Sequence, residues 1–337
     1  MKVLFSFFIF IAISLNAQVI DKRSYYDYGN KFFASFLIEP IAGKDSSEIT
    51  FLFKISNSAL SFNKNNIDDA DKNTFTAFPI VESSLTDETG IIRQRTFWKD
   101  TVVIEDFEET EKKFSYIFGQ NKYVLANGKY NVKIKLLDKF SKKIDELKFN
   151  INAGFNSKKL SSLFFCGNND EKKYEPFILN NKIHFNSYST KAFLFSKTKN
   201  EDFSYRCQKL KDKKYKWNKD IDLTGRVNNL NSTALKLKQN NIRQKPFLLT
   251  EKHNNRYSLL EFNLPSEQFV PGKYKLTLRN DNSGDTSVSY FEVVWEDKPL
   301  SLQNIDYGVK SMYYVMTEEE HDKLDDGSKN QKFNKRI

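Results

Sequence analysis

The fold is indicated most directly by a run of alternating side chains, Gly128-Lys129-Tyr130-Asn131-Val132-Lys133-Ile134-Lys135-Leu136. Its apolar residues occupy every second position from Tyr130 to Leu136, so they share one face of an extended chain, while the lysines and Asn131 share the other. A β-strand with one buried and one hydrated face has this pattern. The run therefore predicts a strand of an antiparallel sheet that covers a hydrophobic core.

The same signature returns in the second half of the chain as Gly272-Lys273-Tyr274-Lys275-Leu276-Thr277-Leu278. In both copies a glycine precedes a tyrosine that opens the strand. This arrangement is typical of the penultimate strand of immunoglobulin- or fibronectin-like sandwiches, where the tyrosine closes the preceding corner. A polar turn and a further strand follow each copy, over 146–151 and over 288–295. We therefore expect two similar β-sandwich domains, each ending in a hairpin.

Further strands are predicted over 48–55, 75–82 and 91–97, and the turn Asp87-Glu88-Thr89-Gly90 separates the last two. The expected fold class is all-β, with two tandem immunoglobulin/fibronectin-like β-sandwiches followed by a short α-helical C-terminal segment. The chain divides by this interpretation into four parts: a signal peptide over 1–17, a first sandwich over 18–153, a second sandwich over 154–297, and the helical start of a truncated C-terminal domain over 298–337.

The first residues have the pattern of a secretory signal peptide. Lys2 precedes an apolar run from Val3 to Leu15, and Ala17 supplies a small residue for cleavage, which would leave Gln18 first. The run is shorter than the roughly 20 apolar residues of a membrane-spanning helix. We therefore expect an exported protein in the periplasm, at the outer membrane or in the medium, with no transmembrane segment after cleavage.

Export makes the two cysteines, Cys166 and Cys207, candidates for a disulfide, because oxidising compartments favour pairing. A disulfide that closes a loop of this size would raise the free energy of unfolding by about 4 kcal/mol, if it acts only by lowering the entropy of the unfolded chain. The alternative is two buried free thiols. Sequence does not decide between them, since pairing depends on the geometry of both backbones.

The end of the chain changes character. Ile305, Val309, Met312 and Met316 recur at spacings of three and four residues, which predicts an amphipathic helix. Thr317-Glu318-Glu319-Glu320 then predicts a capping box that opens a second helix. Too few apolar residues follow Trp295 to build a core, so we expect the C-terminal domain to be truncated.

Five segments of this tail carry a family resemblance: Phe291-Glu292-Val293-Val294-Trp295, Lys298-Pro299-Leu300-Ser301-Leu302, Ile305-Asp306-Tyr307-Gly308-Val309, Met312-Tyr313-Tyr314-Val315 and Thr317-Glu318-Glu319-Glu320. Together they resemble the lead-in to the GWxTD domain of exported bacterial proteins. In that family, whose function is uncharacterised, β-sandwich modules precede the C-terminal domain. The defining Gly-Trp-x-Thr-Asp motif is absent from this sequence. The resemblance implies a cell-envelope protein and no particular reaction.

Residues with catalytic or metal-binding chemistry are few. The sequence has 3 His and no Gly-rich phosphate loop, Gly-x-Ser-x-Gly, His-Glu-x-x-His or Cys-x-x-Cys, so we expect no cofactor and no enzyme activity. Cys166 with His184 could form a nucleophile and base, but an ordinary structural role is favoured for both. The acidic runs 105–111 and 281–285 could bind calcium, yet neither has EF-hand spacing. A solvated connection and a hairpin turn, respectively, are the favoured interpretations.

The net charge of +10 comes from 53 Lys and Arg against 43 Asp and Glu, with both signs interspersed along the chain, which does not indicate nucleic-acid binding. The strongest basic cluster spans 197–219 and contains interleaved aromatic residues. Its candidate binding patch consists of Lys209, Lys211, Lys213, Lys214, Tyr215, Lys216 and Trp217. Such a patch suits anionic polysaccharide or lipid headgroups. A solvated hairpin whose aromatic residues face the core is the favoured alternative.

The sequence therefore favours a non-catalytic structural or binding protein of the cell envelope, with another envelope protein or an anionic polysaccharide as its partner. The alternative hypothesis is that the sandwiches are accessory N-terminal modules of an enzyme or polysaccharide-binding protein whose active domain lies beyond residue 337.

Overall fold

The computed structural model describes residues 31–65, 74–112, 114–140, 144–156, 159–170, 173–180, 182–185, 189–211, 220–231, 233–252, 257–295 and 317–325. These residues are predominantly β-strand, which confirms the predicted all-β class. The expected signal peptide and the expected helix over 305–316 lie outside the described residues. None of the described helices has the length and hydrophobicity that crossing a lipid bilayer requires.

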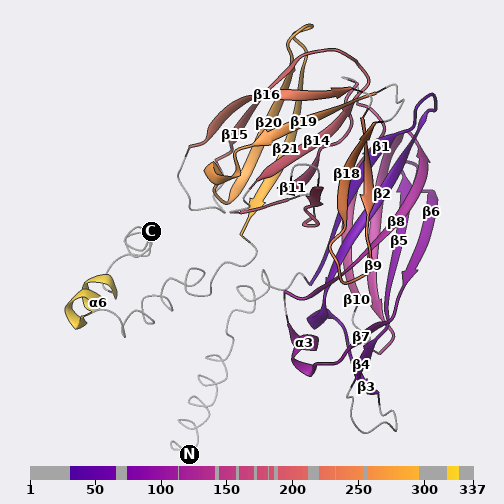
Figure 1. The fold of residues 1–337 in the computed structure, drawn as a ribbon, viewed down its shortest axis with the longest axis vertical. Helices are drawn as coiled ribbons and strands as arrows, with labels where there is room; N and C mark the ends of the chain where they lie inside the picture. Colours follow the sequence, from indigo (N-terminus) through magenta and orange to yellow (C-terminus); the bar gives the residue numbers. More distant parts are fainter. Residues whose placement is uncertain are drawn as a thin grey trace, which may run out of the picture. The chain divides into compact units, whose positions relative to one another are not determined.

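The N-half of the protein comprises strands β1 to β10 and the helix α3 (Figure 1). Its strands are β1 (Phe32–Pro40), β2 (Ser46–Ser56), β3 (Asn63–Asn65), β4 (Thr74–Ala77), β5 (Pro79–Asp87), β6 (Ile92–Lys99), β7 (Val102–Ile104), β8 (Tyr116–Ala126), β9 (Gly128–Asp138) and β10 (Ile144–Ala153). The helix α3 spans Phe107–Glu111, and a 3-10 turn spans Asn57–Ala59. In the described residues the strands form three antiparallel sheets, ordered β1-β2-β8, β10-β9-β5-β6 and β3-β4-β7.

The C-half comprises strands β11 to β21. Its elements are β11 (Phe164–Asp170), β12 (Lys173–Pro176), β13 (Ile183–His184), β14 (Thr190–Ser196), β15 (Phe203–Lys209), β16 (Asp222–Asn231), β17 (Thr233–Lys238), β18 (Phe247–Lys252), β19 (Ser258–Leu264), a 3-10 turn at Ser266–Gln268, β20 (Gly272–Asn280) and β21 (Thr286–Val294). In the described residues they form one sheet, ordered β13-β21-β20-β15-β16-β19-β14-β11-β12-β18-β17.

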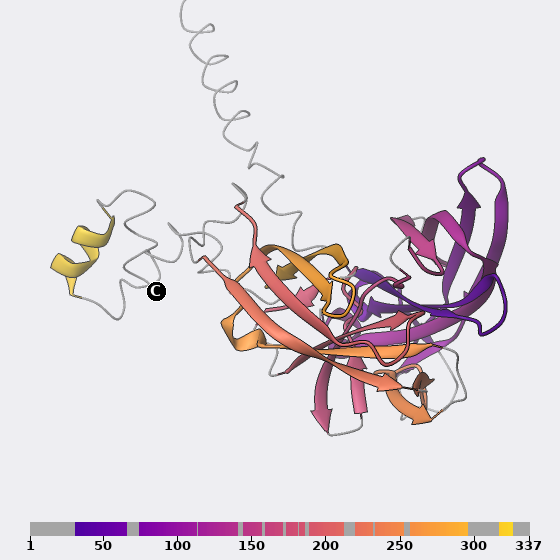
Figure 2. The same ribbon diagram turned by 90° about the horizontal axis from the view of Figure 1, so that it is seen from above.

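This sheet curls because β16 pairs with a different neighbour along each of its two parts. Residues 222–226 pair with β15, whereas residues 227–231 pair with β19. The strand thereby joins two layers, which cross at an angle in the view from above (Figure 2). A core of buried side chains from both layers, including Leu260, Phe262 and Tyr274, fills the space between them.

The predicted strands are confirmed with one correction. The strand expected over 75–82 is two strands, because β4 ends at Ala77 and β5 begins at Pro79 in a different sheet. Proline has no N–H for the ladder, so it is tolerated at the first position of a strand. In β9 the side chains of Tyr130, Val132, Ile134 and Leu136 are buried, as the alternation predicts.

Both expected hairpins and both expected tyrosine corners are present. β9 pairs with β10, and β20 pairs with β21. The Tyr130 hydroxyl donates a hydrogen bond to the Ala126 carbonyl at 2.9 Å, and the Tyr274 hydroxyl donates one to the Val270 carbonyl at 2.7 Å. Each tyrosine thus ties the start of its strand to the corner before it.

The predicted capping box is also present at the end of the described chain. The helix α6 spans Glu318–Asp325 and begins after Thr317. The Thr317 hydroxyl donates to Glu320 Oε2 at 2.8 Å, and the backbone N–H of Thr317 donates to the same oxygen at 3.0 Å. The Glu320 carboxylate thus satisfies donors at the start of the helix.

Strand β1 is apolar on both faces, and the reason is that two cores lie on either side of its sheet. Phe32, Ala34, Phe36 and Ile38 enter the core between the first two sheets of the N-half. Phe33 and Leu37 point the other way, into a core shared with the C-half. This explains why residues 32–38 form a nearly continuous apolar run instead of an alternating one.

The shared core joins the two halves. The N-half contributes Phe33, Leu37, Leu52 and Phe118 to this core. The C-half contributes buried side chains of β11, β12, β14, β17, β18 and β19 and of the segment after β12. They are Phe164, Cys166, Tyr174, Ile178, Leu179, Phe193, Phe195, Leu235, Leu248 and Leu259. The sheet β1-β2-β8 therefore packs against the β11, β14 and β19 side of the large sheet. The two halves are not independent domains on a string, because they share buried apolar surface.

Hydrogen bonds at the rim complete this contact. Asn180, which has a left-handed φ of 56°, accepts a bond from the Ala34 N–H through Oδ1 at 2.9 Å and donates its own N–H to the Ala34 carbonyl at 2.8 Å. Gln239 Nε2 donates to the Phe118 carbonyl at 3.1 Å, and the Tyr257 hydroxyl donates to the Ile41 carbonyl at 3.2 Å. Backbone groups at the margin of the shared core are thus satisfied.

Leu52→Ala tests how much the shared core contributes to the free energy of unfolding. Leu52 is fully buried there, so removing its side chain leaves a cavity, and we expect the free energy of unfolding to fall by about 2–5 kcal/mol. The measurement is urea denaturation followed by tryptophan fluorescence. Val124→Ala on β8, where the side chain is 62% exposed, is the control and should change stability by less than about 0.5 kcal/mol. Equal losses for both variants would contradict the expected weight of this core.

Candidate interaction surface

The predicted basic patch is only partly within the described residues. Lys213, Lys214, Tyr215, Lys216 and Trp217 lie outside them, whereas Lys209 and Lys211 are described. Lys209 ends β15, and its aliphatic stem lies against Gly272, where an added Cβ would be 2.9 Å from Lys209 Cε. Burial lowers the pKa of Lys209. Lys211 is exposed.

The aromatic residues of the same cluster that are described face the interior. Phe203 and Tyr205 are buried in the core of the C-half. The Tyr205 hydroxyl donates to the Asn263 carbonyl at 2.6 Å. For these two residues the core interpretation is the correct one, because both occupy inward positions of β15.

The candidate disulfide is wrong. Cys166 and Cys207 are free thiols, and both are buried. They enter different cores, since Cys166 on β11 points into the shared core and Cys207 on β15 points into the core of the C-half. Four strand steps of the sheet also separate β11 from β15, which the short reach of a disulfide does not bridge.

Burial also makes both thiols unreactive. It raises the pKa of the Cys166 thiol well above its ordinary value and raises the pKa of Cys207 to about 12. The thiolate is the reactive form, so neither residue has the character of a nucleophile. His184, the base considered with Cys166, lies on β13 with Nδ1 at 2.7 Å from the Phe185 carbonyl oxygen.

Thiol titration provides a direct test. Without reductant, an aromatic disulfide reagent should react slowly with the native chain and should release two thiols per chain in denaturant, because both cysteines are free. Cys166→Ser and Cys207→Ser should each release one. Failure of the denatured parent to release any thiol would mean that the cysteines are paired.

Within the described part of the chain, no three His, Cys, Asp or Glu side chains are grouped so that they could hold a metal ion. The run over 105–111 forms α3, and Asp106 caps it by accepting a hydrogen bond from the Glu108 N–H at 2.9 Å. The run over 281–285 is the turn between β20 and β21. Its Asp281 carboxylate accepts a hydrogen bond from the Ser204 hydroxyl at 2.7 Å.

One polar cluster was not anticipated from the sequence. Glu261 on β19 is only 6% exposed and forms an ion pair with Lys191 on β14. The Tyr174 hydroxyl and Asn228 Nδ2 each donate to the Glu261 carboxylate at 3.4 Å. Burial, and then the charge of Glu261, raise the pKa of Tyr174 to about 12. The available signal was Glu261 within the otherwise apolar run 259–262.

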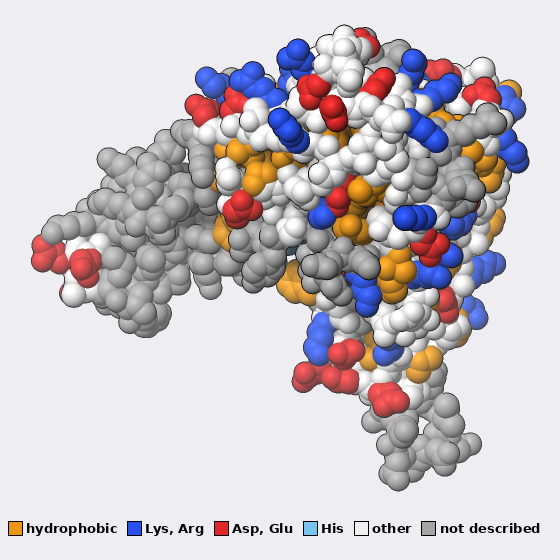
Figure 3. Space-filling view, turned by 45° about the horizontal axis from the view of Figure 1, so that its top comes forward, with side chains coloured by type: hydrophobic (Ala, Val, Ile, Leu, Met, Phe, Trp, Pro, Cys, Tyr) orange, Lys and Arg blue, Asp and Glu red, His pale blue; other side chains and the backbone are white. Residues whose placement is uncertain are grey.

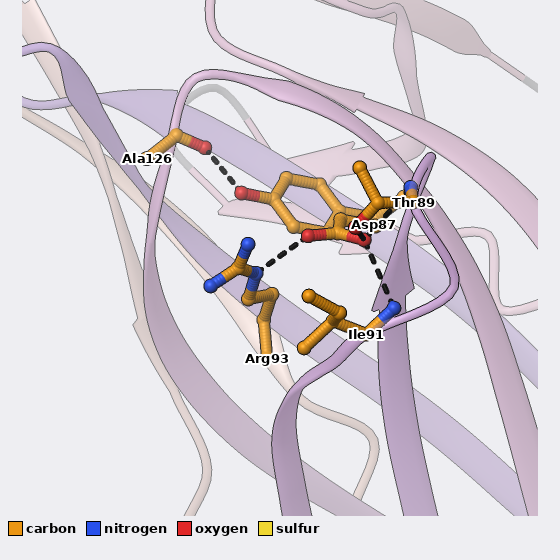
Figure 4. A network of polar contacts seen from close by, with 6 residues as sticks. Asp87, Thr89, Ile91, Arg93 and Ala126 are labelled. Carbon is orange, nitrogen blue, oxygen red and sulfur yellow. Dashed lines mark hydrogen bonds and ion pairs between the residues drawn. The ribbon is translucent and has the colours of Figure 1, made fainter.

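The turn between β5 and β6 carries a second polar network (Figure 4). Asp87 Oδ1 accepts hydrogen bonds from the Thr89 hydroxyl at 2.6 Å, the Thr89 N–H at 2.9 Å and the Ile91 N–H at 3.0 Å. Arg93 Nε donates to Oδ2 at 2.5 Å. The hydroxyl of Thr89, followed by Arg93 and the backbone donors, holds the pKa of the Asp87 carboxyl well below its usual range.

Asp87→Asn should therefore have a pH-dependent effect. A carboxyl whose pKa is lowered by folding stabilises the folded state above its unfolded pKa, which is 3.8, and loses this contribution as the pH falls further. We expect the variant to melt at a lower temperature than the parent at pH 7, with the gap shrinking below about pH 4. Thermal melts between pH 2.5 and 7 measure the gap. A gap that stays constant over this range would mean that the charge of Asp87 does not contribute.

On the solvent face of β10-β9-β5-β6, acidic and basic side chains of neighbouring strands form ion pairs with one another. Across the strands, one row consists of Lys148, Lys133, Ser84 and Arg95, and the next consists of Glu146, Lys135, Glu82 and Phe97. Glu146 pairs with Lys133 at 2.8 Å and with Lys148 at 3.1 Å. Arg95 pairs with Glu82 at 2.6 Å. On the side of the molecule drawn in Figure 3, Lys and Arg side chains are scattered among Asp and Glu.

The corresponding face of the C-half is less compensated. We call it the Tyr290 face, and it is formed by the outward side chains of four strands. They are Val288, Tyr290 and Glu292 on β21, Lys273, Lys275, Thr277 and Arg279 on β20, Ser204, Arg206 and Gln208 on β15, and Asp222, Thr224 and Arg226 on β16. Arg206 pairs with Asp222, and Glu292 pairs with Lys182 at 2.9 Å. Among the described residues, Lys275, Arg279 and Arg226 form no ion pair. This face therefore carries uncompensated positive charge.

Tyr290 lies on β21, next to the short edge strand β13. Its side chain is 69% exposed, and Val288 beside it on β21 is 43% exposed. In register, Tyr290 is opposite Lys275, which is in turn opposite Gln208. The face thus combines an exposed aromatic ring with neighbouring cations and hydrogen-bonding side chains. The alternation of 286–290 marks Tyr290 as outward-facing, but no motif in the sequence distinguishes this face from other strand faces.

No protein-family model and no curated protein matches the chain. Among solved structures, a β-glucuronidase of Bacteroides uniformis is similar at a TM-score of 0.23 and 15% identity, over 47% of this chain and 16% of that chain. A structure of manganese lipoxygenase of Gaeumannomyces graminis with a partial zonadhesin of Komagataella pastoris gives a TM-score of 0.14 and 9% identity, over 76% and 92% of the two chains. Neither similarity is high enough to support an argument about function.

Proposed function

We propose that this protein is an exported, non-catalytic structural and binding protein of the cell envelope, in which two immunoglobulin/fibronectin-like sandwiches form one rigid platform. The observation that carries the proposal is the shared core, which buries the second face of the sheet β1-β2-β8 against the C-half.

The sheet orders support the immunoglobulin/fibronectin-like assignment. In the N-half, a three-stranded sheet β1-β2-β8 packs against the four-stranded sheet β10-β9-β5-β6. The same connectivity recurs in the C-half as β11-β14-β19 and β21-β20-β15-β16. A tyrosine corner stands before the penultimate strand of each half, as in many sandwiches of this class.

The contact between the halves favours a rigid platform, in which the two halves do not move relative to each other, and not a flexible pair of domains. Domains within one chain move relative to each other by default, unless their interface is large and hydrophobic. Here the interface contains fully buried Leu52, Leu248 and Leu259. A structural protein that holds a surface at a fixed orientation needs such a contact, whereas a simple tether does not.

Export and an envelope location belong to the same proposal. They are supported by the signal-peptide pattern of the first seventeen residues and by the resemblance of 291–320 to the lead-in of the GWxTD domain. Fractionation of cells that express the full chain, with N-terminal sequencing of the exported product, would test both. The expected first residue is Gln18, and a cytoplasmic chain that still begins at Met1 would contradict export.

Calorimetry tests the platform. We expect the full chain to unfold in one cooperative transition for both halves, because a shared core couples them. A loosened variant, Asn180→Gly with Gln239→Ala and Tyr257→Phe, removes the rim hydrogen bonds made by these three side chains and keeps the backbone of residue 180, whose N–H still donates to the Ala34 carbonyl. It should melt at a lower temperature than the parent, because the contact between the halves is weakened. Two transitions in the parent would contradict the platform.

The loosened variant also separates a structural role from a catalytic one. In a strain that lacks the gene, the parent should restore the envelope barrier, measured by uptake of a fluorescent dye. The variant should restore it poorly even when exported to the parental level. Full restoration by the variant would contradict a function that depends on a fixed arrangement of the halves.

A further inference from the structure

The Tyr290 face has the features of a ligand-binding surface more than those of an ordinary hydrated sheet face. A solvated strand usually exposes polar side chains and keeps aromatic rings inside. Here Tyr290 is 69% exposed on β21, near the edge of a sheet face, while Phe291 next to it is buried in the core. The core of the C-half is therefore filled without Tyr290, and the ring is free to contact another molecule.

The charges around the ring point to an anionic ligand. Five Lys and Arg residues stand on this face against Glu292 and Asp222, which are both paired with cations, and against Asp281, which follows β20 and accepts a hydrogen bond from Ser204. Lys275 lies directly across from Tyr290, and Arg279 lies two pairs further along the same strand. Arg226 lies across β15 from Arg279, with Ser204 between them. Since adjacent strands are about 4.8 Å apart, the unpaired cations extend over several strands.

The uncharged side chains on the face point to a ligand rich in hydroxyl groups. Thr277 lies between Lys275 and Arg279 along β20, Gln208 lies opposite Lys275 on β15, and Thr224 lies opposite Arg206 on β16. Hydroxyl and amide groups both donate and accept hydrogen bonds. A sugar presents hydroxyls at its edge and C–H groups on its ring face, which suit the polar neighbours and the negative face of an aromatic ring, respectively.

A protein partner fits this face less well. A stable protein interface covers about 800 Å² on each partner and has an apolar centre depleted of charge. The large apolar side chains exposed on this face are Tyr290 and Val288, within the described residues. The surface is otherwise polar or cationic, which favours a flexible anionic polymer over a second folded surface.

We propose that the Tyr290 face binds an acidic polysaccharide, with a sugar ring stacked on Tyr290 and its carboxylates held by Lys275, Arg279 and Arg226. This adds a ligand class to the proposed platform and rests on its binding role. The proposed binding surface is this sheet face, in place of the patch predicted from the sequence over 209–217.

Binding of polygalacturonate to the full chain, measured by isothermal titration calorimetry, tests the proposal. The parent should bind polygalacturonate and should bind neither neutral dextran nor poly-L-glutamate at matched chain length. Tyr290→Ala should weaken binding by about tenfold, and Lys275→Gln with Arg279→Gln should weaken it and flatten its salt dependence.

The matched control is Phe97→Ala. Phe97 is 51% exposed on the other outer sheet face and has Arg95 at 5.3 Å from its ring centroid, but its neighbours are charge-compensated. This variant should keep parental affinity, and circular dichroism should show all variants folded. Absence of polygalacturonate binding, an equal loss for Phe97→Ala, or equal binding of poly-L-glutamate would overturn the proposal; the last would indicate an acidic protein partner. Calorimetric unfolding tests the platform independently, so failure here would leave that result unaffected.

Discussion

The structure depends on one constraint, the burial of the sheet β1-β2-β8 on both faces. Phe36, Phe51 and Phe53 pack into the core of the N-half, while Leu37 and Leu52 pack into the core shared with the C-half. A sheet buried on both faces cannot be exposed on one of them without placing a row of apolar side chains in water. The two halves are therefore held together by the same hydrophobic effect that folds each of them.

This arrangement also determines which surfaces are available for function. The inner three-stranded layers are occupied by packing, so the outward faces of β10-β9-β5-β6 and β21-β20-β15-β16 are the broad sheet faces that remain in contact with solvent. They differ in chemistry. On the first, Glu82 and Glu146 neutralise their cationic neighbours. On the second, Tyr290 is exposed beside unpaired cations, so the second face is the better candidate for recognition.

A buried ion pair and two buried thiols also lie inside the described part of the chain. The Lys191–Glu261 ion pair lies on the sheet side that faces the shared core, and the hydrogen bonds from Tyr174 and Asn228 satisfy the carboxylate. A buried charge pair adds little net stability, but its geometric demands favour one arrangement of the strands around it. The thiols Cys166 and Cys207 act as small apolar side chains in separate cores.

The sequence by itself determined the local structure. Alternation predicted the strand at Tyr130, the Gly-Lys-Tyr repeat predicted both terminal hairpins and both tyrosine corners, and Thr317 predicted its capping box, because each depends on residues close in the chain. Tertiary structure alone decided the separation of Cys166 from Cys207, the shared core and the pairing of Lys191 with Glu261. These depend on which sheet faces meet, and strand periodicity gives the face of a side chain without giving the surface that packs against it.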